Sequence, residues 1–459
     1  MATPAIPGER DVPTHGERLP RRLGLWSAIA VLVGSTIGSG IFRVPSTVAA
    51  DVGGLGAILL IWLLGAVVAL FGALTLAELA AIFPRSGGIY VFLREAYGPL
   101  PAFLFGWTEL LVIRPSALGA IAMIFATYTT SLFGLPEGRA RWLAAAAIVV
   151  LAWANVRSVL WASAIVNATT AAKIAALAGV ASIAFAFGDP STGALVSTVS
   201  FTPRSWAGFG VALIAVLWAY DGWADLTFVA GEVKAPARTM PRALVIGTVL
   251  VVALYLLVNL AYLYVLPIDQ MAGSKLVAAD AARAIFGEVG ASVISALVML
   301  SAFGALTGST LTGPRILYAM ADDGLFFRPI AKVHPTYQTP YTAILLTSAL
   351  GVAYVSIREF ETLAGDFILG IWPFYALAVG AVFILRSKRA DIVRPYRTTG
   401  YPVVPIVFLL ASVLMLGNSL VENTAATGRD FAIILIGIPV YLVWRARAKQ
   451  DDQPGSRRP

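Results

Sequence analysis

Two short groups of glycine, hydroxyl and acidic residues interrupt long apolar runs, and they carry the most chemical information in the sequence. Residues 34–40 read GSTIGSG in the first apolar run, and residues 218–225 read WAYDGWAD in a later one. Glycine and hydroxyl residues weaken a helix and leave backbone N–H and C=O groups free for other partners. In hydrocarbon, such groups are tolerated where they line a polar cavity or bind a ligand. Each group therefore predicts a broken membrane helix that forms part of a binding site.

The groups freed at two facing breaks suit a small molecule that carries both charges. The N-terminus of a half-helix presents N–H groups and the positive end of the helix dipole, which favour a carboxylate. Unwound carbonyls and a half-helix C-terminus favour an ammonium group. An α-amino acid carries both charges on adjacent atoms, so two breaks can hold its backbone while its side chain enters a pocket. The alternative, that these glycines only allow close helix packing, explains two polar clusters at matching positions less well.

The composition indicates which elements carry the breaks. The chain has 459 residues, 58% hydrophobic and 13% charged, whereas soluble domains average about 25% charged residues. Its apolar runs are long and continuous, which favours transmembrane helices and excludes a β-barrel. With no cysteine and only two histidines, the chain cannot form disulfides or thiolate metal sites, and an integral-membrane enzyme would lack its usual residues. We expect no catalytic residue, metal or cofactor.

Twelve apolar stretches are long enough to cross a hydrocarbon core of about 30 Å. We expect spans at 25–50, 56–82, 101–132, 142–158, 160–187, 206–232, 241–266, 290–320, 340–357, 365–386, 402–421 and 430–447. The breaks fall in the first and sixth spans, and this separation is typical of two inverted five-helix repeats. The expected units are an N-terminal tail (1–24), a first repeat (25–187), a second repeat (206–386), two further helices (402–447) and a C-terminal tail (448–459).

The distribution of basic residues sets the expected orientation. With both termini in the cytoplasm, most of the 33 lysines and arginines lie in cytoplasmic tails and loops, as the positive-inside rule requires. The net charge of +8 does not indicate nucleic acid, because the basic residues lie between membrane spans. Residues 83–100 are amphipathic, and we expect a short helix along the cytoplasmic surface there.

Eight short motifs match one transporter family in order and spacing, although each alone is weak. They are GSGIF at 38–42, FPRSGG at 83–88, LREAYGP at 93–99, WTELLVIRP at 107–115, AYDGW at 219–223, PRA at 241–243, RPYR at 394–397 and GYP at 400–402. Together they resemble the amino acid–polyamine–organocation (APC) superfamily and, within it, the L-type amino acid transporter (LAT) family. The resemblance covers nearly all of the membrane region. It implies an all-α integral membrane protein of the LeuT type, with 12 transmembrane helices, discontinuous helices 1 and 6, and alternating access to amino acids.

Carried over by position, the resemblance places substrate-binding residues at the first break. They are Thr36, Ile37, Gly38, Ser39 and Gly40. Among them, Ser39 and Gly40 match the family's donors to the substrate carboxylate.

At the second break, the resemblance assigns backbone carbonyls of Trp218, Ala219 and Asp221 to the substrate ammonium. Trp218 takes the place of an aromatic gate that is usually phenylalanine. The chain departs from the family pattern twice: Ala224 stands where some members have asparagine, and Asp221 where others have glycine. Both departures leave the side-chain specificity open.

Lys173 lies near the middle of the span 160–187, too far from either interface to snorkel. A lysine at the bilayer centre costs about 2.5–3.5 kcal/mol on insertion scales, so something must compensate for it. Lys173 could have a structural role only, with its ammonium bonded to backbone carbonyls. The preferred interpretation, which the resemblance supports, is a fixed ammonium that replaces a sodium ion and joins span five to span one. A third interpretation is that Lys173 titrates and couples protons.

Four other charged residues in or beside the spans bear on the prediction. Asp221 could accept the substrate ammonium, neutralise Lys173, receive a cationic side chain, or be satisfied by freed N–H groups. Glu109 and Arg114 are five residues apart, so we expect them on different helix faces with partners elsewhere. For Arg43, we expect contact with outer water rather than steering of anions.

The sequence thus predicts a sodium-independent amino acid transporter, an exchanger of mainly neutral L-amino acids that works by alternating access. The alternative is proton-coupled uptake on the same fold, with cationic amino acids included. A passive channel would need a selectivity filter that the sequence does not show. Animal L-type carriers pair with a glycoprotein through a disulfide, which this chain cannot form. We therefore expect it to act alone in a bacterial plasma membrane, with amino acids and lipid as its partners.

Overall fold

The computed structural model describes residues 21–85, 87–196 and 199–451, and it is built from helices. Apart from one isolated bridge between Leu23 and Val233, these residues form no β-structure. Most of the two predicted tails lies outside the described residues. The helical prediction is therefore confirmed for the membrane region.

Sixteen α-helices and seven shorter helical turns succeed one another along the described chain. The α-helices are α1 (Leu25–Thr36), α2 (Val44–Val52), α3 (Leu55–Ile82), α4 (Ile89–Tyr97), α5 (Pro99–Thr108), α6 (Arg114–Leu132), α7 (Ala140–Arg157), α8 (Val159–Phe187), α9 (Trp206–Tyr220), α10 (Pro236–Val265), α11 (Ile268–Gly273), α12 (Val277–Asp322), α13 (Tyr341–Ile357), α14 (Phe360–Lys388), α15 (Val403–Glu422) and α16 (Thr424–Asp451). The shorter turns are η2 (Gly40–Phe42), η3 (Glu109–Ile113), η4 (Glu137–Arg139), η5 (Pro190–Thr192), η6 (Ala194–Val196), η7 (Asp225–Glu232) and η8 (Arg328–Ala331).

Nine helical segments of the described residues are long and apolar enough to cross a membrane. They are Leu55–Ile82, Pro99–Leu132, Glu137–Arg157, Trp206–Glu232, Pro236–Val265, Val277–Asp322, Phe360–Lys388, Val403–Glu422 and Thr424–Ala446. Shorter apolar helices occur at Leu25–Thr36, Lys173–Phe187 and Tyr341–Ile357. Large apolar side chains such as Trp142 and Leu414 stay exposed on the outer helices, as contact with lipid requires. The chain is a multi-pass helical membrane protein.

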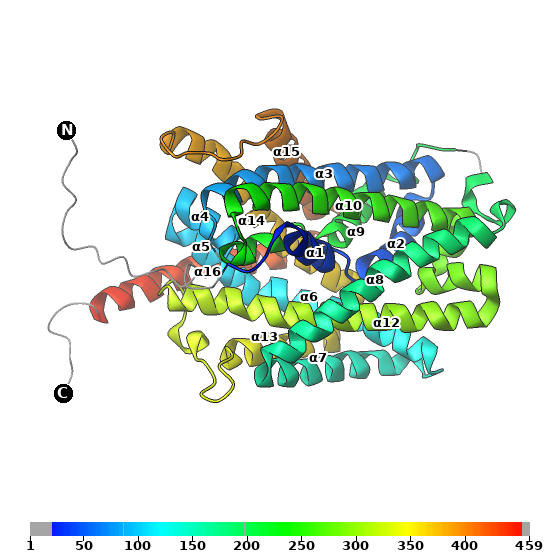
Figure 1. The fold of residues 1–459 in the computed structure, drawn as a ribbon, viewed down its shortest axis with the longest axis horizontal. Coiled ribbons are helices and arrows are strands. Elements are labelled where there is room, and N and C mark those ends of the chain that lie inside the picture. Colours follow the sequence, from blue (N-terminus) through cyan, green and yellow to red (C-terminus); the bar gives the residue numbers. More distant parts are fainter. Residues whose placement is uncertain (1–20, 86, 197–198, 452–459) are drawn as a thin grey trace.

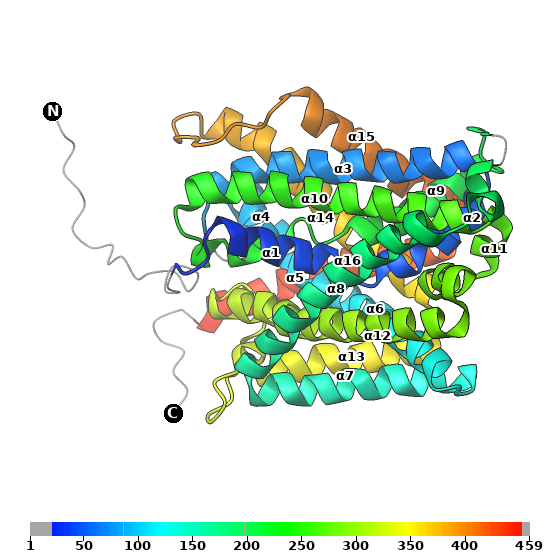
Figure 2. The same ribbon diagram turned by 45° about the vertical axis from the view of Figure 1, so that its right-hand side comes forward.

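The first helix lies inside the bundle, which is what places its break at the centre of the protein. Figures 1 and 2 show α3 and α10 side by side along one side, α7, α12 and α13 along the opposite side, and α1 between them. α1 packs on α10 and touches η7, while α12 packs on both α6 and α8. The helices that pack around α1 thus come from later parts of the chain.

Three local features agree with the sequence. α7 ends at Arg157 and α8 begins at Val159, at the expected boundary. α4 lies within the stretch 83–100, where a short helix was expected. α12 is interrupted at Gly287, whose φ of +62° favours glycine, so the span expected from residue 290 is its second part.

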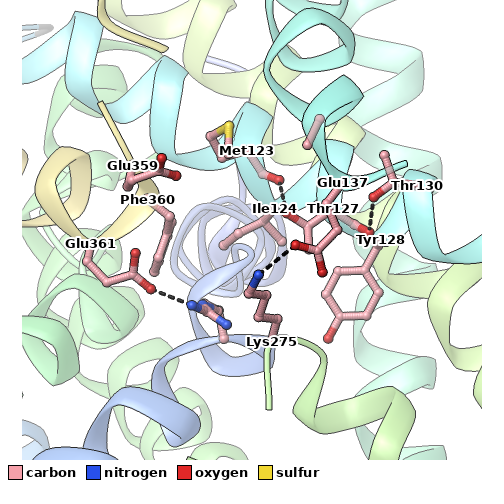
Figure 3. A pocket seen from close by; sticks show the side chains of 12 residues that line it. Met123, Ile124, Thr127, Tyr128, Thr130, Glu137, Lys275, Glu359, Phe360 and Glu361 are labelled. Carbon is pink, nitrogen blue, oxygen red and sulfur yellow. Dashed lines mark hydrogen bonds and ion pairs between the residues drawn. The ribbon is translucent and has the colours of Figure 1, made fainter. Parts of the chain in front are cut away.

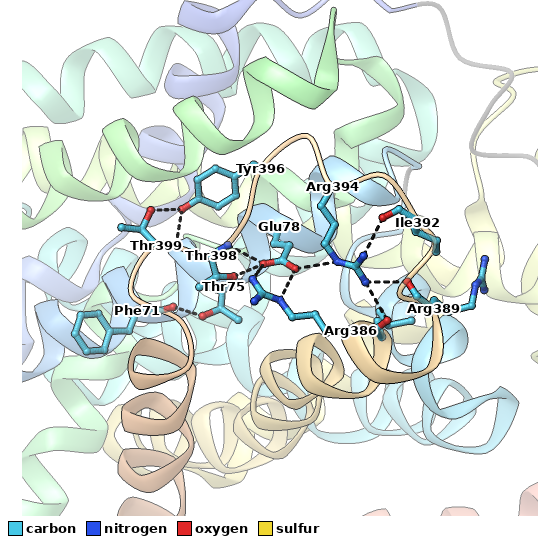
Figure 4. A network of polar contacts seen from close by, with 11 residues as sticks. Phe71, Thr75, Glu78, Arg386, Arg389, Ile392, Arg394, Tyr396, Thr398 and Thr399 are labelled. Carbon is cyan, nitrogen blue, oxygen red and sulfur yellow. Dashed lines mark hydrogen bonds and ion pairs between the residues drawn. The ribbon is translucent and has the colours of Figure 1, made fainter.

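A buried polar network fixes the predicted cytoplasmic ends of α3 and α14 (Figure 4). The Glu78 carboxylate accepts hydrogen bonds from Nη2 of Arg386 at 2.6 Å and from Nε of Arg386 at 3.0 Å. The backbone N–H and the hydroxyl of Thr398 also donate to it, and Arg394 pairs with it at 3.4 Å. These contacts hold the loop after α14 against α3, so the two helix ends cannot separate without breaking a buried ion pair.

Candidate functional site

The first break follows directly from the glycine and hydroxyl residues of the sequence. α1 ends at Thr36, and regular α-helix resumes only at Val44. Within the described chain, the backbone N–H groups of Ser39 and Gly40 find no acceptor of normal geometry. The Ser39 hydroxyl is also without a partner there, although the residue is only 1% exposed. Buried donors seldom stay unbonded, so this turn is prepared for an acceptor such as a carboxylate.

Side chains from three other helices donate hydrogen bonds to three carbonyls in and beside this break. Tyr255 of α10 donates from its hydroxyl to the Thr36 carbonyl at 2.8 Å. Tyr128 of α6 donates to the Phe42 carbonyl at 3.2 Å. From α8, the Lys173 ammonium, 1% exposed, donates to the Gly34 carbonyl at 3.3 Å. The unbonded N–H groups of Ser39 and Gly40 suit this turn to an anionic group.

The second break contributes free carbonyls. α9 ends at Tyr220, Gly222 adopts a φ of +111°, and the 3₁₀ turn η7 begins at Asp225. Among the described residues, no N–H group donates a hydrogen bond of normal geometry to the carbonyls of Ala219 or Asp221. Free carbonyls beside a carboxylate suit a cationic group, because both attract positive charge.

The other predicted residues of this break are partly engaged. The Trp218 carbonyl accepts a bond from the Asp221 N–H at 3.2 Å, and the Asp221 carboxylate accepts one from the Tyr375 hydroxyl of α14 at 2.7 Å. Ala224 is fully buried, and its carbonyl accepts bonds from the N–H and hydroxyl of Thr227. Asp221 therefore already has one partner before any substrate arrives.

The two breaks touch each other. A Cβ atom added to Gly40 would lie 2.8 Å from the Cα atom of Ala219 and 3.3 Å from the Trp218 ring. One added to Gly222 would lie 2.8 Å from the backbone of Thr36. Only glycine lets these backbones approach so closely, so the structure brings together the two sites that the sequence predicted separately.

An aromatic cluster lies beside this contact, on its predicted outer side. The Trp218 indole packs edge-to-face on Phe367, with ring centroids 4.9 Å apart, and on Phe360 at 6.3 Å. Its Nε1 atom is buried and has no partner among the described residues. This position agrees with the gate role expected for Trp218, which remains a prediction.

The expectation for Glu109 and Arg114 is wrong. Arg114 Nη2 lies 2.5 Å from the Glu109 carboxylate. Residues five apart would be about 140° apart around an α-helix, but residues 109–113 form a π-helical turn in which the Arg114 N–H bonds to the Glu109 carbonyl. This wider turn brings the two side chains to one face. Arg114 also donates to Ser309 of α12 at 2.9 Å and lies against Gly313.

The expectation that Arg43 simply reaches outer water is also wrong. It forms an ion pair with Glu361 and donates to the Ser274 carbonyl at 3.2 Å. Arg43 lines a cavity of about 180 Å³ on the predicted outer side of the breaks (Figure 3). The lining residues are Arg43, Met123, Ile124, Thr127, Tyr128, Thr130, Glu137, Ala140, Lys275, Glu359, Phe360 and Glu361.

Sequence reasoning missed the tyrosines that complete the site. Tyr128, Tyr255 and Tyr375 lie in apolar runs and carry no local signal, since a tyrosine there is as often a packing residue as a hydrogen-bond donor. Only the neighbouring broken helices give their hydroxyls a function.

The close contact of the breaks gives a direct test. Gly40→Ala adds a methyl group that can be accommodated only if the two backbones move apart, and such overpacking costs about 1–3 kcal/mol. We expect amino acid transport in proteoliposomes to fall by roughly one order of magnitude or more. Gly417→Ala in α15 is the matched control, because its added Cβ atom would meet no atom within 4 Å. Equal transport by the two variants would contradict a functional contact.

Comparison with known proteins agrees with this geometry. The model of a family described as amino acid permease matches residues 23–443. The chain is 33% identical over 437 residues to the serine/threonine exchanger SteT of Bacillus subtilis. The matched region covers 95% of this chain and 99% of the relative.

Two animal proteins are similarly related. Identity to the human b(0,+)-type amino acid transporter 1 is 32% over 406 residues, or 86% of this chain and 82% of the relative. Identity to the rat large neutral amino acids transporter small subunit 2 is 33% over 456 residues, which cover 95% of this chain and 83% of the relative. The similarity therefore extends across both breaks.

Proposed function

This chain belongs to the amino acid permease family, and from that premise we propose that it exchanges amino acids across a membrane by alternating access. One observation supports this most: a break with free N–H groups lies against a break with free carbonyls. That pair of surfaces is complementary to the carboxylate and ammonium of an α-amino acid. The SteT relative is named a serine/threonine exchanger, so we propose small neutral L-amino acids as substrates.

We propose the LeuT-type arrangement for the fold. Its two inverted five-helix repeats would be residues 25–187 and 206–386, followed by two helices within 402–447. The nine long apolar segments and three shorter apolar helices support twelve spans. The distribution of lysine and arginine supports cytoplasmic tails at 1–24 and 448–459.

We further propose that transport does not need sodium. The Lys173 ammonium, held at the Gly34 carbonyl of the first break, places a fixed positive charge between α8 and α1. A mobile cation would then be unnecessary for joining these helices. The substrate would be bound by Thr36, Ile37, Gly38, Ser39 and Gly40 at one break and by Trp218, Ala219, Asp221 and Ala224 at the other.

Uptake of labelled serine into proteoliposomes tests this proposal. We expect vesicles loaded with unlabelled serine to take up label much faster than empty vesicles, and replacement of sodium by choline to change nothing. Equal uptake into empty vesicles would contradict exchange, and strict sodium dependence would contradict the role of Lys173. Accumulation driven by an inward proton gradient would instead support proton-coupled uptake.

We propose that the chain works without a covalently attached subunit. It contains no cysteine, so it cannot form a disulfide with a second protein. Its near full-length similarity to a Bacillus protein supports a bacterial plasma membrane as its location. Exchange by the purified single chain, with no other protein in the vesicles, is the expected result.

A further inference from the structure

The cavity beside Arg43 is separate from the contact between the breaks. Its rim side chains are strongly exposed, with Glu137 at 80%, Lys275 at 59% and Glu361 at 49%. Its floor is nearly closed, since Phe360 is 7% exposed and Tyr128 1%. The cavity therefore opens toward water on one side. Phe360, which packs on Trp218, lies between it and the second break.

Charges of both signs line this cavity, and each positive charge is already paired. Arg43 pairs with Glu361, and Lys275 Nζ lies 2.8 Å from the Glu137 carboxylate. Figure 3 shows Glu361 on one side of the cavity and Glu137, beside Lys275, on the other. The guanidinium of Arg43 is 18% exposed and lies 5.9 Å from the centre of the Phe360 ring. Arg43 is thus the deepest positive charge in the cavity, and it follows Gly40 of the first break by three residues.

We propose that this cavity is an outer binding site for a zwitterionic α-amino acid, which would occupy it before reaching the breaks. The carboxylate of the amino acid replaces Glu361 at the Arg43 guanidinium. The released Glu361, together with Glu359, accepts the ammonium group. This exchange of partners conserves charge and leaves no ion unpaired, so it avoids the penalty of a desolvated lone charge. The proposal rests on the proposed function for the identity of the ligand.

The size of the cavity fits this ligand. Its volume is about 180 Å³, and a water molecule occupies about 30 Å³ of the liquid, so it holds the equivalent of about six waters. A small amino acid such as serine has this size. Thr127 and Thr130 bring hydroxyl groups to the wall, while Met123 and Ile124 add apolar surface.

The alternative is that Arg43 and Glu361 form only a latch between the end of η2 and the start of α14. The two models predict different changes in the inhibition of serine uptake by a ligand that has a carboxylate and no ammonium, such as 3-hydroxypropanoate. If the cavity binds carboxylates, Glu361→Gln frees Arg43 and strengthens inhibition of serine uptake by this probe, whereas Arg43→Gln weakens it. If the pair is a latch, both substitutions break it, and inhibition changes in the same direction.

The test is inhibition of labelled serine uptake by 3-hydroxypropanoate in intact cells, in which the outer face of the protein is accessible to the probe. The inhibition constant should fall by about threefold to tenfold in Glu361→Gln and rise at least as much in Arg43→Gln, as expected for one charged hydrogen bond that water partly screens. Inside-out vesicles should show no such difference. Arg204→Gln is the matched control, because it breaks the exposed pair with Asp269 and neither residue lines the cavity.

Shifts in the same direction in both variants, or no shift in either, would overturn the outer site. Serine exchange by the wild-type protein would then still support the proposed function. If the wild-type protein exchanges no amino acid, the proposed function itself fails. Arg43→Lys guards against misfolding of Arg43→Gln, because it keeps the positive charge and should retain part of the inhibition.

Discussion

Lys173→Met is expected to reduce serine exchange at least tenfold, or about 1.4 kcal/mol in the transport barrier, without unfolding the protein. The ammonium bonds to the Gly34 carbonyl at the end of α1, so its loss removes the contact that couples α8 to the first break. Methionine is similar in length and apolar, so the helix packing is kept. Exchange in proteoliposomes and thermal unfolding in detergent are the two measurements.

The two measurements separate a functional lysine from a structural one. A lysine at the bilayer centre costs about 2.5–3.5 kcal/mol on insertion scales, and the one carbonyl partner that it has among the described residues lies at 3.3 Å. Removing the charge should therefore leave the unfolding midpoint unchanged or higher. Lys332→Met, in an exposed loop, is the control and should change neither quantity. A lower midpoint together with normal exchange would show that Lys173 serves structure alone.

The features that could be predicted from the sequence are those that depend on local composition. Residues 34–40 weaken their own helix, and the structure ends α1 at Thr36 for that reason. The same holds for residues 218–225, where α9 ends at Tyr220 and the chain continues as a 3₁₀ turn. Apolar length likewise predicted the helical class. None of these inferences requires knowledge of which helices become neighbours.

The features that were missed depend on those neighbours. Arg43 meets Glu361 only because the fold brings the start of α14 beside η2. The hydroxyl of Tyr255 has a role only because α10 packs on the end of α1. The π-helical turn is a different case, since it is local but changes the angular spacing of the side chains. A helical periodicity of 3.6 residues therefore gave the wrong face for Arg114.

The ion pair at this π-helical turn leads to the second large prediction. Breaking a buried pair by removing one partner costs about 3–5 kcal/mol, and Glu109 is 1% exposed. The two single variants should nevertheless differ. Arg114 also lies within electrostatic reach of Asp225 and Asp221. In Glu109→Gln, the Arg114 guanidinium still has the carboxylates of Asp221 and Asp225 nearby. In Arg114→Gln, these two carboxylates and that of Glu109 all lose the guanidinium.

We therefore expect Arg114→Gln to lower the free energy of unfolding by about 3–5 kcal/mol and Glu109→Gln by clearly less, as measured by denaturation in mixed micelles. The double variant should be more stable than Arg114→Gln alone, because one uncompensated carboxylate is removed with the arginine. Such non-additivity is typical of residues in one network. Arg114→Gln should also reduce exchange, because mutual repulsion between Asp221 and Asp225 would distort the second break. Equal losses for the two single variants would instead describe an isolated pair, and the acids of the second break would then not depend on Arg114.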